Sequence, residues 1–373
     1  MRIREIRVTR GLIPGLICGI CGLALALAAP VGAQTKSVPE LSRAGWDALN
    51  AGRIPDAAAA FAEALKRRPT DPQLLLGAGV AAHLSGRADE ARQALSDALR
   101  MDPSLTSASL LLGEVLYRGG DLDGAILVYE QALANAPGNA QIARRLDAWR
   151  REAALHGRFG QRLGDHFTVM FEGPAESALA DKAVALLEAA YWRIGTALNT
   201  YPADVVTVVL YTREQFRDIT QSPAWAGGVF DGRIRVPVQG ALQNPREFER
   251  VLTHEFTHAL VRGLAPRGVP TCLNEGIAVV FEGSSAPPRE EQLRAAKTRI
   301  PLASLERSFG ALGQDEAVLA YAESAAAVQA MLDLGGPAAI AGVLTDIGRG
   351  LPFPEAFERN MLISYDEFKA AQR

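Results

Sequence analysis

Cysteine is scarce in this chain, which has three cysteines among its 373 residues. Two of them, Cys18 and Cys21, lie in an N-terminal apolar stretch, so Cys272 stands alone in the remainder. One cysteine cannot form an internal disulfide. We therefore expect Cys272 to be a small buried apolar residue rather than a ligand or a nucleophile.

Runs of basic residues are missing beyond the first ten positions. The chain begins with four arginines, an apolar stretch from residue 11 to 29, and small residues up to Ala33. This pattern predicts a signal peptide over residues 1–33 that is cleaved before Gln34, and hence a secreted or periplasmic protein without a membrane span. The alternative is a retained membrane anchor, because the apolar stretch is close to the shortest length that crosses a bilayer.

The charge balance excludes several classes of partner. Removing residues 1–33 takes away four arginines and one glutamate, which leaves 35 basic and 41 acidic residues. Without a basic run, nucleic acid and anionic lipid are not expected as partners. Hydrophobic residues make up 48% of the chain and charged residues 22%, which is typical of a globular protein, and the length favours two or three domains.

An internal repeat with a period of 34 residues occupies residues 38–139. The positions in phase are Gly45, Gly79 and Gly113; Gly52, Gly86 and Gly120; Phe61, Leu95 and Tyr129; and Pro69, Pro103 and Pro137. Small residues let two antiparallel helices approach, the large apolar residue fills the space between them, and the proline ends the second helix. The pattern is similar to the tetratricopeptide repeat.

The repeat predicts an all-α solenoid over residues 38–158, made of three units and a capping helix. The capping helix, near residues 139–155, should turn its charged residues to solvent: Arg144, Arg145, Arg150, Arg151 and Glu152. The solenoid would either hold a peptide or partner protein in its concave groove or pack against its own catalytic half.

One short stretch combines two of the five histidines with a carboxylate. It reads His254-Glu255-x-x-His258 within an apolar helical pattern. Residues four apart lie on one face of a helix, so both imidazoles can reach one ion with Glu255 beside them. Zinc hydrolases use this arrangement: two neutral nitrogens hold the metal, and the carboxylate takes a proton from water. The alternative is a pair of core histidines and a solvated glutamate.

A zinc site needs a third protein ligand. No histidine follows His258, so a carboxylate must serve. Glu275, seventeen residues after His258, opens a second apolar helix and is the best candidate. Its neighbour Gly276 is small enough for close contact between helices. Glu282, two turns further along the same face, is the weaker rival.

The second half of the chain mixes strand and helix patterns. We predict strands at residues 166–171 and 204–211, helices at residues 174–200, 315–334, 337–347 and 354–372, a short helix capped by Thr212 and Gln215, and a metal helix from Asn244 to Gly263. Asp231-Gly232 predicts a hairpin over residues 227–237. Either this hairpin supplies the strand that borders a substrate cleft, or it is a plain surface hairpin.

The two parts of the metal motif together resemble a known family. The motif at His254, Glu255 and His258, followed by Asn274-Glu275-Gly276, resembles the gluzincin metallopeptidases and among them the peptidase MA-like domains. The resemblance covers residues 165–373 and implies an α+β zincin-like fold with a helical C-terminal part, one Zn²⁺, and hydrolysis of peptide bonds. It implies His254, His258 and Glu275 as ligands and Glu255 as general base. Val279 departs from the thermolysin-like pattern, in which an aspartate at this position orients a ligand histidine.

A tetrahedral oxyanion needs a donor besides the metal. Tyr321 resembles the position that often carries this role, and Tyr365 is the other downstream candidate. The competing interpretation is that Tyr321 only packs in a helical core.

Two functions remain open at this level. The first is a zinc-dependent metallopeptidase of the cell envelope, acting on a peptide or protein substrate and recruiting protein through its repeats. The alternative is a non-catalytic tetratricopeptide scaffold that carries an inactive or structural zincin domain.

Overall fold

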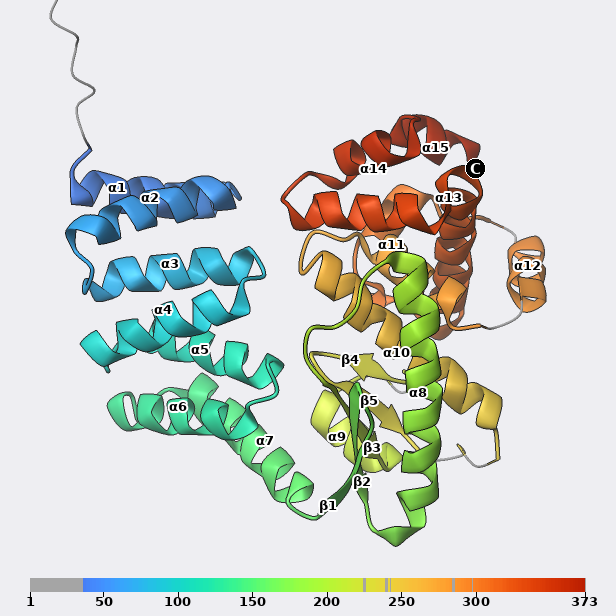
Figure 1. Cartoon of the computed structure of the whole chain (residues 1–373), viewed down its shortest axis with the longest axis horizontal. Coiled ribbons are helices and arrows are strands. Elements are labelled where there is room, and N and C mark those ends of the chain that lie inside the picture. The colour runs from blue at the N-terminus through green and yellow to red at the C-terminus, as the bar shows by residue number, and fades with distance from the viewer. Residues whose placement is uncertain are drawn as a thin grey trace, which may run out of the picture. The chain divides into compact units, whose positions relative to one another are not determined.

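The computed structural model describes residues 36–223, 226–238, 241, 243–283, 286–296 and 298–372 (Figure 1). The predicted signal peptide lies outside the described residues.

Three helical hairpins and a seventh helix form the first half, as the period of 34 residues predicts. The helices are α1 (Val38–Asn50), α2 (Ile54–Arg67), α3 (Pro72–Leu84), α4 (Ala88–Met101), α5 (Thr106–Arg118), α6 (Leu122–Asn135) and α7 (Ala140–His156). Each neighbour along the chain is also a neighbour in space (Figure 1). The all-α solenoid is thus confirmed.

The residues in phase explain why each pair of helices packs. A Cβ atom added at Gly45 would lie 2.7 Å from the Phe61 ring, and one at Gly79 would lie 2.7 Å from Leu95. A Cβ atom added at Gly113 would likewise overlap the Tyr129 ring. Only glycine leaves room for the large side chain that the next helix inserts. The turn glycines at 52, 86 and 120 all have positive φ, which glycine adopts without strain.

The capping helix α7 differs from its prediction. Its residue Glu152 is only 2% exposed, and Arg145 is half-buried in an ion pair with Glu114. The expectation of solvent exposure is therefore wrong for Glu152 and Arg145, whereas Arg144, Arg150 and Arg151 are exposed as predicted. Sequence pattern could not reveal the reason, because the hydrogen-bond donors to Glu152 lie between 35 and 83 residues away along the chain.

Those partners form a buried polar network between α7 and the sheet. Tyr117 donates a 2.8 Å hydrogen bond to Glu152, and Arg235 donates another of 2.8 Å. Arg235 also donates to the hydroxyl oxygens of Tyr117 and Tyr211, and Arg233 donates to Glu152 at 3.3 Å. Burial alone would raise the pKa of Glu152, but the charge of Arg235 and these hydrogen bonds lower it.

A mixed five-stranded sheet begins the second half, with the strands in the order β1-β2-β3-β5-β4. The strands are β1 (Phe159–Leu163), β2 (Phe167–Glu172), β3 (Val206–Tyr211), β4 (Val229–Phe230) and β5 (Ile234–Pro237). β2, β3 and β5 are parallel, and the two outer strands are antiparallel to their neighbours. The hairpin prediction is confirmed, and its first strand β4 is an edge of the sheet.

Helices cover the sheet and complete the fold. They are α8 (Ser177–Leu198), α9 (Arg213–Thr220), α10 (Pro245–Leu264), α11 (Thr271–Phe281), α12 (Ala286–Ala295), α13 (Gln314–Gly348), α14 (Phe353–Met361) and α15 (Tyr365–Ala371). One core includes residues of β2, β3, β5, α8, α10, α11, α13 and α14. This mixed domain with helices toward its C-terminus confirms the predicted fold class. Among the described helices, α13 alone is long and apolar enough to cross a membrane, a test that core helices also pass.

Several helix boundaries differ from the predictions. The metal helix continues through Gly263 to Leu264, because Gly263 keeps a helical backbone. Gly336, with φ 70° and ψ −177°, breaks α13 near the predicted place. The predicted last helix is two helices, since Leu362 adopts a left-handed conformation and Ser364 caps α15. Thr212 and Gln215 form the predicted capping box of α9.

Candidate metal centre

The helix α10 places both motif histidines on one face. Its start is fixed by Asn244, whose side chain accepts a hydrogen bond from the backbone of Glu247, and by Pro245 at the first helical position. Apolar residues on its buried face, among them Phe256 and Leu260, anchor it in the core beside the sheet. The spacing of four then directs His254 and His258 to the same side.

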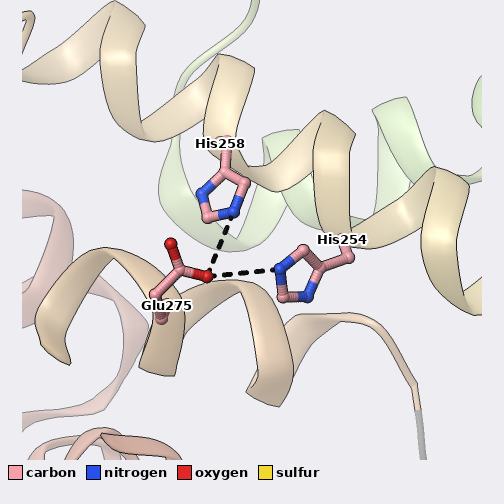
Figure 2. Close-up of side chains that lie close together, drawn as sticks. All are labelled: His254, His258 and Glu275. Atoms are coloured by element: carbon pink, nitrogen blue, oxygen red, sulfur yellow. Dashed lines mark ion pairs between the residues drawn. The ribbon is translucent and has the colours of Figure 1, made fainter. Parts of the chain in front are cut away.

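Helix α11 brings Glu275 to these histidines. One carboxylate oxygen of Glu275 lies 3.4 Å from Nε2 of His254 and 3.4 Å from Nε2 of His258 (Figure 2). Glu275 lies in the second turn of α11 rather than at its opening. The adjacent Gly276 lets α11 approach α13, because a Cβ atom there would collide with the backbone of Ser324.

Hydrogen bonds on the far side of each imidazole fix its orientation. Nδ1 of His254 donates to Glu282 at 2.8 Å, and Nδ1 of His258 donates to Asn274 at 3.1 Å. Both Nε2 atoms therefore carry the lone pair when the rings are neutral, and both point toward the Glu275 carboxylate (Figure 2). Ligand histidines in metalloproteins are held in this way.

Charge in the cluster favours a cation. Burial alone would lower the pKa of His254, but hydrogen bonds to Glu275 and Glu282 raise it to about 10. Burial would raise the pKa of Glu275, but the two histidines lower it. The acidic groups therefore attract positive charge between the rings, and protons and a divalent metal ion compete for that place.

Glu255 lies beside this cluster and is 6% exposed. Burial raises the pKa of its carboxyl group, although the neighbouring histidines oppose the rise. A Cβ atom at Gly228 would lie 2.7 Å from a carboxylate oxygen of Glu255, so glycine leaves that carboxylate its space.

A cavity of about 420 Å³ opens onto these groups. Its lining includes His254, Glu255, His258 and Glu275, and the edge strand β4 forms one wall with Val229 and Phe230. The predicted position of the hairpin at a cleft therefore agrees with the structure.

The two candidate tyrosines differ in position. Tyr321 of α13 lines the cavity, and its ring centroid lies 6.2 Å from that of His254. Burial, and then the charge of Glu275, raises its pKa, so the hydroxyl keeps its proton and can donate. Tyr365 instead donates to Glu306 and packs on Phe353, and it is not among the described residues that line the cavity.

Comparison with known proteins finds two family models that match this chain. Residues 42–106 and 85–140 match the family model of the tetratricopeptide repeat, and residues 189–366 match that of the Peptidase MA superfamily. This chain joins tetratricopeptide repeats to a Peptidase MA superfamily domain. Peptidases of this superfamily are generally metallopeptidases. A search of the curated proteins finds no match.

Several solved structures resemble about a third of this chain. The Sgt2 repeat domain of Aspergillus fumigatus is 22% identical, with 35% of this chain and 88% of that chain covered and a TM-score of 0.32. The first repeat domain of human RPAP3 is 19% identical (32% and 93% covered, TM-score 0.30), and the chaperone SycD of Yersinia enterocolitica is 18% identical (31% and 86% covered, TM-score 0.30). These scores carry no further conclusion.

The donor set of the Peptidase MA domain fits zinc. Two ligands bound at about 2.1 Å to a tetrahedral ion lie roughly 3.4 Å apart, and the distances from Glu275 to both histidines have this value. The set of two imidazoles and one carboxylate is also the one that catalytic zinc sites use with an open fourth position. Cys272 is not part of it: the thiol is buried, which raises its pKa to about 12.

Sequence reasoning missed the residues that orient the histidines of the Peptidase MA domain. With Val279 in place of an acidic residue, no orienting partner could be assigned. The structure supplies Glu282, one turn further on, which also accepts a 3.0 Å hydrogen bond from Arg250. In the sequence, Glu282 lies two helical turns after Glu275. That spacing suits a metal ligand and a residue that orients a histidine equally well, so it does not distinguish the two roles.

Replacing Glu282 by glutamine is expected to weaken zinc affinity about ten- to hundredfold, because His254 loses a charged acceptor. Competition with a chromophoric chelator measures the dissociation constant. The matched control is Glu247→Gln, since Glu247 also bonds Arg250 but is exposed and does not contact a histidine. Equal affinities in the two variants would show that Glu282 does not support the site.

Proposed function

We propose that this chain is a zinc-dependent metallopeptidase that hydrolyses peptide bonds. The observation that carries the proposal is the placement of Glu275 at 3.4 Å from both Nε2 atoms, beside the buried carboxylate of Glu255. The Peptidase MA superfamily match supports the same activity.

The roles of the residues follow from their chemistry. His254, His258 and Glu275 would hold the ion, which would supply Lewis acidity to water and to the scissile carbonyl. Glu255 accepts the proton of the attacking water and returns it to the leaving amine. Its raised pKa brings proton uptake closer to neutral pH. Tyr321 donates a hydrogen bond to the oxyanion of the tetrahedral adduct.

The edge strand β4 provides a way to hold an extended peptide. It pairs with β5 on one side only, and it lies in the cavity wall next to Glu255. A substrate can add to such an edge as a further strand, with main-chain hydrogen bonds that need no particular sequence. Pairing of substrate with β4 is part of the proposal.

The tetratricopeptide repeats complete the proposal as a recruiting domain for a protein or peptide partner. Proteins of this repeat class offer extended concave surfaces for such partners. We also propose secretion or export to the periplasm, which the leader-like pattern of residues 1–33 supports.

Hydrolysis of a mixed peptide library by the purified protein tests the activity. We expect cleavage that a chelator abolishes and one equivalent of zinc restores. Bound zinc without turnover on the library would overturn the proposal and favour the scaffold that carries an inactive zincin domain.

Replacing Tyr321 by phenylalanine is expected to lower kcat about a hundredfold with little change in KM, because the hydroxyl acts mainly on the transition state. Steady-state kinetics on one cleaved peptide measures both constants. Tyr365→Phe is the control, since that hydroxyl bonds Glu306 instead. An unchanged kcat in Tyr321→Phe would show that Tyr321 only packs in the helical core and does not donate to the oxyanion.

A further inference from the structure

A third polar side chain follows the two histidines along the cavity face of α10. Arg262 lies four residues after His258, as His258 lies four after His254, so the three share one side of the helix. Arg262 is half-buried and lines the same cavity as the metal centre. Its guanidinium carbon lies 5.7 Å from the centre of the Phe230 ring, which belongs to the edge strand β4.

The loop after α10 adds a second guanidinium to the same cavity. Arg267 lies between Pro266 and Gly268, and all three residues line the cavity. Among the described residues, neither Arg262 nor Arg267 forms an ion pair with a carboxylate. Surface arginines are common, but two unpaired ones in a cavity that also contains the candidate metal centre form a positive subsite.

A third arginine, Arg118, adds positive charge near Arg262 and Arg267. Burial and the charge of Arg118 lower the pKa of both Arg262 and Arg267. The same three arginines act on His83. Burial lowers the pKa of His83 to about 4, together with the charges of Arg267, Arg118 and Arg262.

Asp231 is the acidic group whose charge acts on Arg262 and raises its pKa. Its carboxylate is already engaged by Arg235, at 3.0 Å. Glu255 and Glu275 also line this cavity, but no carboxylate among the described residues forms an ion pair with Arg262 or Arg267. An anion from outside would therefore relieve the repulsion between the guanidinium groups.

We propose that Arg262 and Arg267 form a substrate-recognition subsite for a carboxylate, so that the peptidase prefers peptides with a negative charge close to the cleaved bond. This inference rests on the proposed function and specifies its substrate class. Guanidinium groups bind carboxylates with paired, charge-assisted hydrogen bonds, which gives both affinity and position.

The helix geometry limits where that carboxylate lies. Four residues of α-helix rise about 6 Å, which is roughly the length of two extended residues. The recognised carboxylate therefore belongs to a residue one or two positions from the scissile bond. It is either the side chain of aspartate or glutamate or the α-carboxylate at the C-terminus of a peptide.

Binding to a catalytically blocked protein tests the subsite apart from turnover. The probes are fluorescent hexa-alanine peptides in the zinc-loaded Glu255→Gln protein, with one aspartate or one asparagine at each position and with a C-terminal acid or amide. We expect the acidic peptides to bind about ten- to a hundredfold more tightly than their neutral partners. The aspartate series and the acid–amide pair show which source of carboxylate is used.

Adding Arg262→Gln should remove most of that preference, and adding Arg267→Gln should reduce it. Arg246→Gln, an exposed arginine on the same helix, should leave it unchanged. Equal affinity for acidic and neutral peptides, or no binding of any acidic peptide, would overturn the subsite. A preference that depends on Arg262 in a protein that hydrolyses no peptide would retain the subsite and overturn only the proposed activity.

Discussion

Replacing Glu255 by glutamine is expected to lower kcat for peptide hydrolysis about a hundred- to ten-thousandfold while the metal stays bound. The amide has nearly the shape of the carboxylate but cannot accept the proton of the attacking water. Glu255 is buried beside His254 and His258 without being one of the three clustered donors, so its loss should affect chemistry more than metal affinity. Steady-state kinetics and metal analysis of the same samples measure the two effects.

The matched control is Glu249→Gln, which removes the same charge from an exposed position of α10. It should retain the activity of the unmodified protein. A Glu255→Gln protein with unchanged kcat would contradict the role of general base, whereas loss of zinc together with activity would mean that Glu255 contributes to holding the ion.

Replacing Glu152 by glutamine is expected to lower the free energy of unfolding by about 3 kcal/mol or more. Glu152 is 2% exposed, and it accepts hydrogen bonds from Tyr117, Arg233 and Arg235. Neutralising it leaves Arg235, which is 1% exposed, with Asp231 as its remaining carboxylate. A buried charge that loses a partner is costly because it has no access to water. The midpoint of urea denaturation measures the effect.

Glu130→Gln provides the comparison, since its ion pair with Arg150 has a similar length, 2.7 Å, but is exposed. Exposed pairs of this kind contribute about 1 kcal/mol or less. The pKa of Glu152 is lowered in the folded protein, so its stabilisation is present above its ordinary value of 4.5 and is lost as the pH falls below it. The difference between the native protein and Glu152→Gln should therefore shrink in acid. Equal effects of the two substitutions at neutral pH would contradict the network.

Local patterns predicted most of the fold because local physics determines those parts. The contact of Gly45 with Phe61 is encoded by two residues sixteen positions apart, and the period of 34 repeats it in each unit. The start of α10 likewise depends on the adjacent Asn244 and Pro245. The proximity of Glu275 to the two histidines was also expected from the motif, although the roles of these residues stay predictions.

Residues whose partners lie far along the chain could not be assigned in this way. Glu152 looked like a solvated charge on a capping helix, and only its contact with Arg235 of β5 explains its burial. The orienting role of Glu282 depends on how α11 crosses α10, which spacing does not specify. The sequence does not distinguish Arg262 from a surface arginine, whereas its position in the cavity lining does. In each case the missing information was the packing of two elements.

The metal content of the purified protein tests the central claim most directly. We expect one zinc ion per chain in the native protein, and almost none in Glu275→Ala or His258→Ala proteins whose circular dichroism spectra match the native one. Retention of one zinc per chain in both of these variants, or native protein that binds no zinc from a buffered solution, would contradict the account.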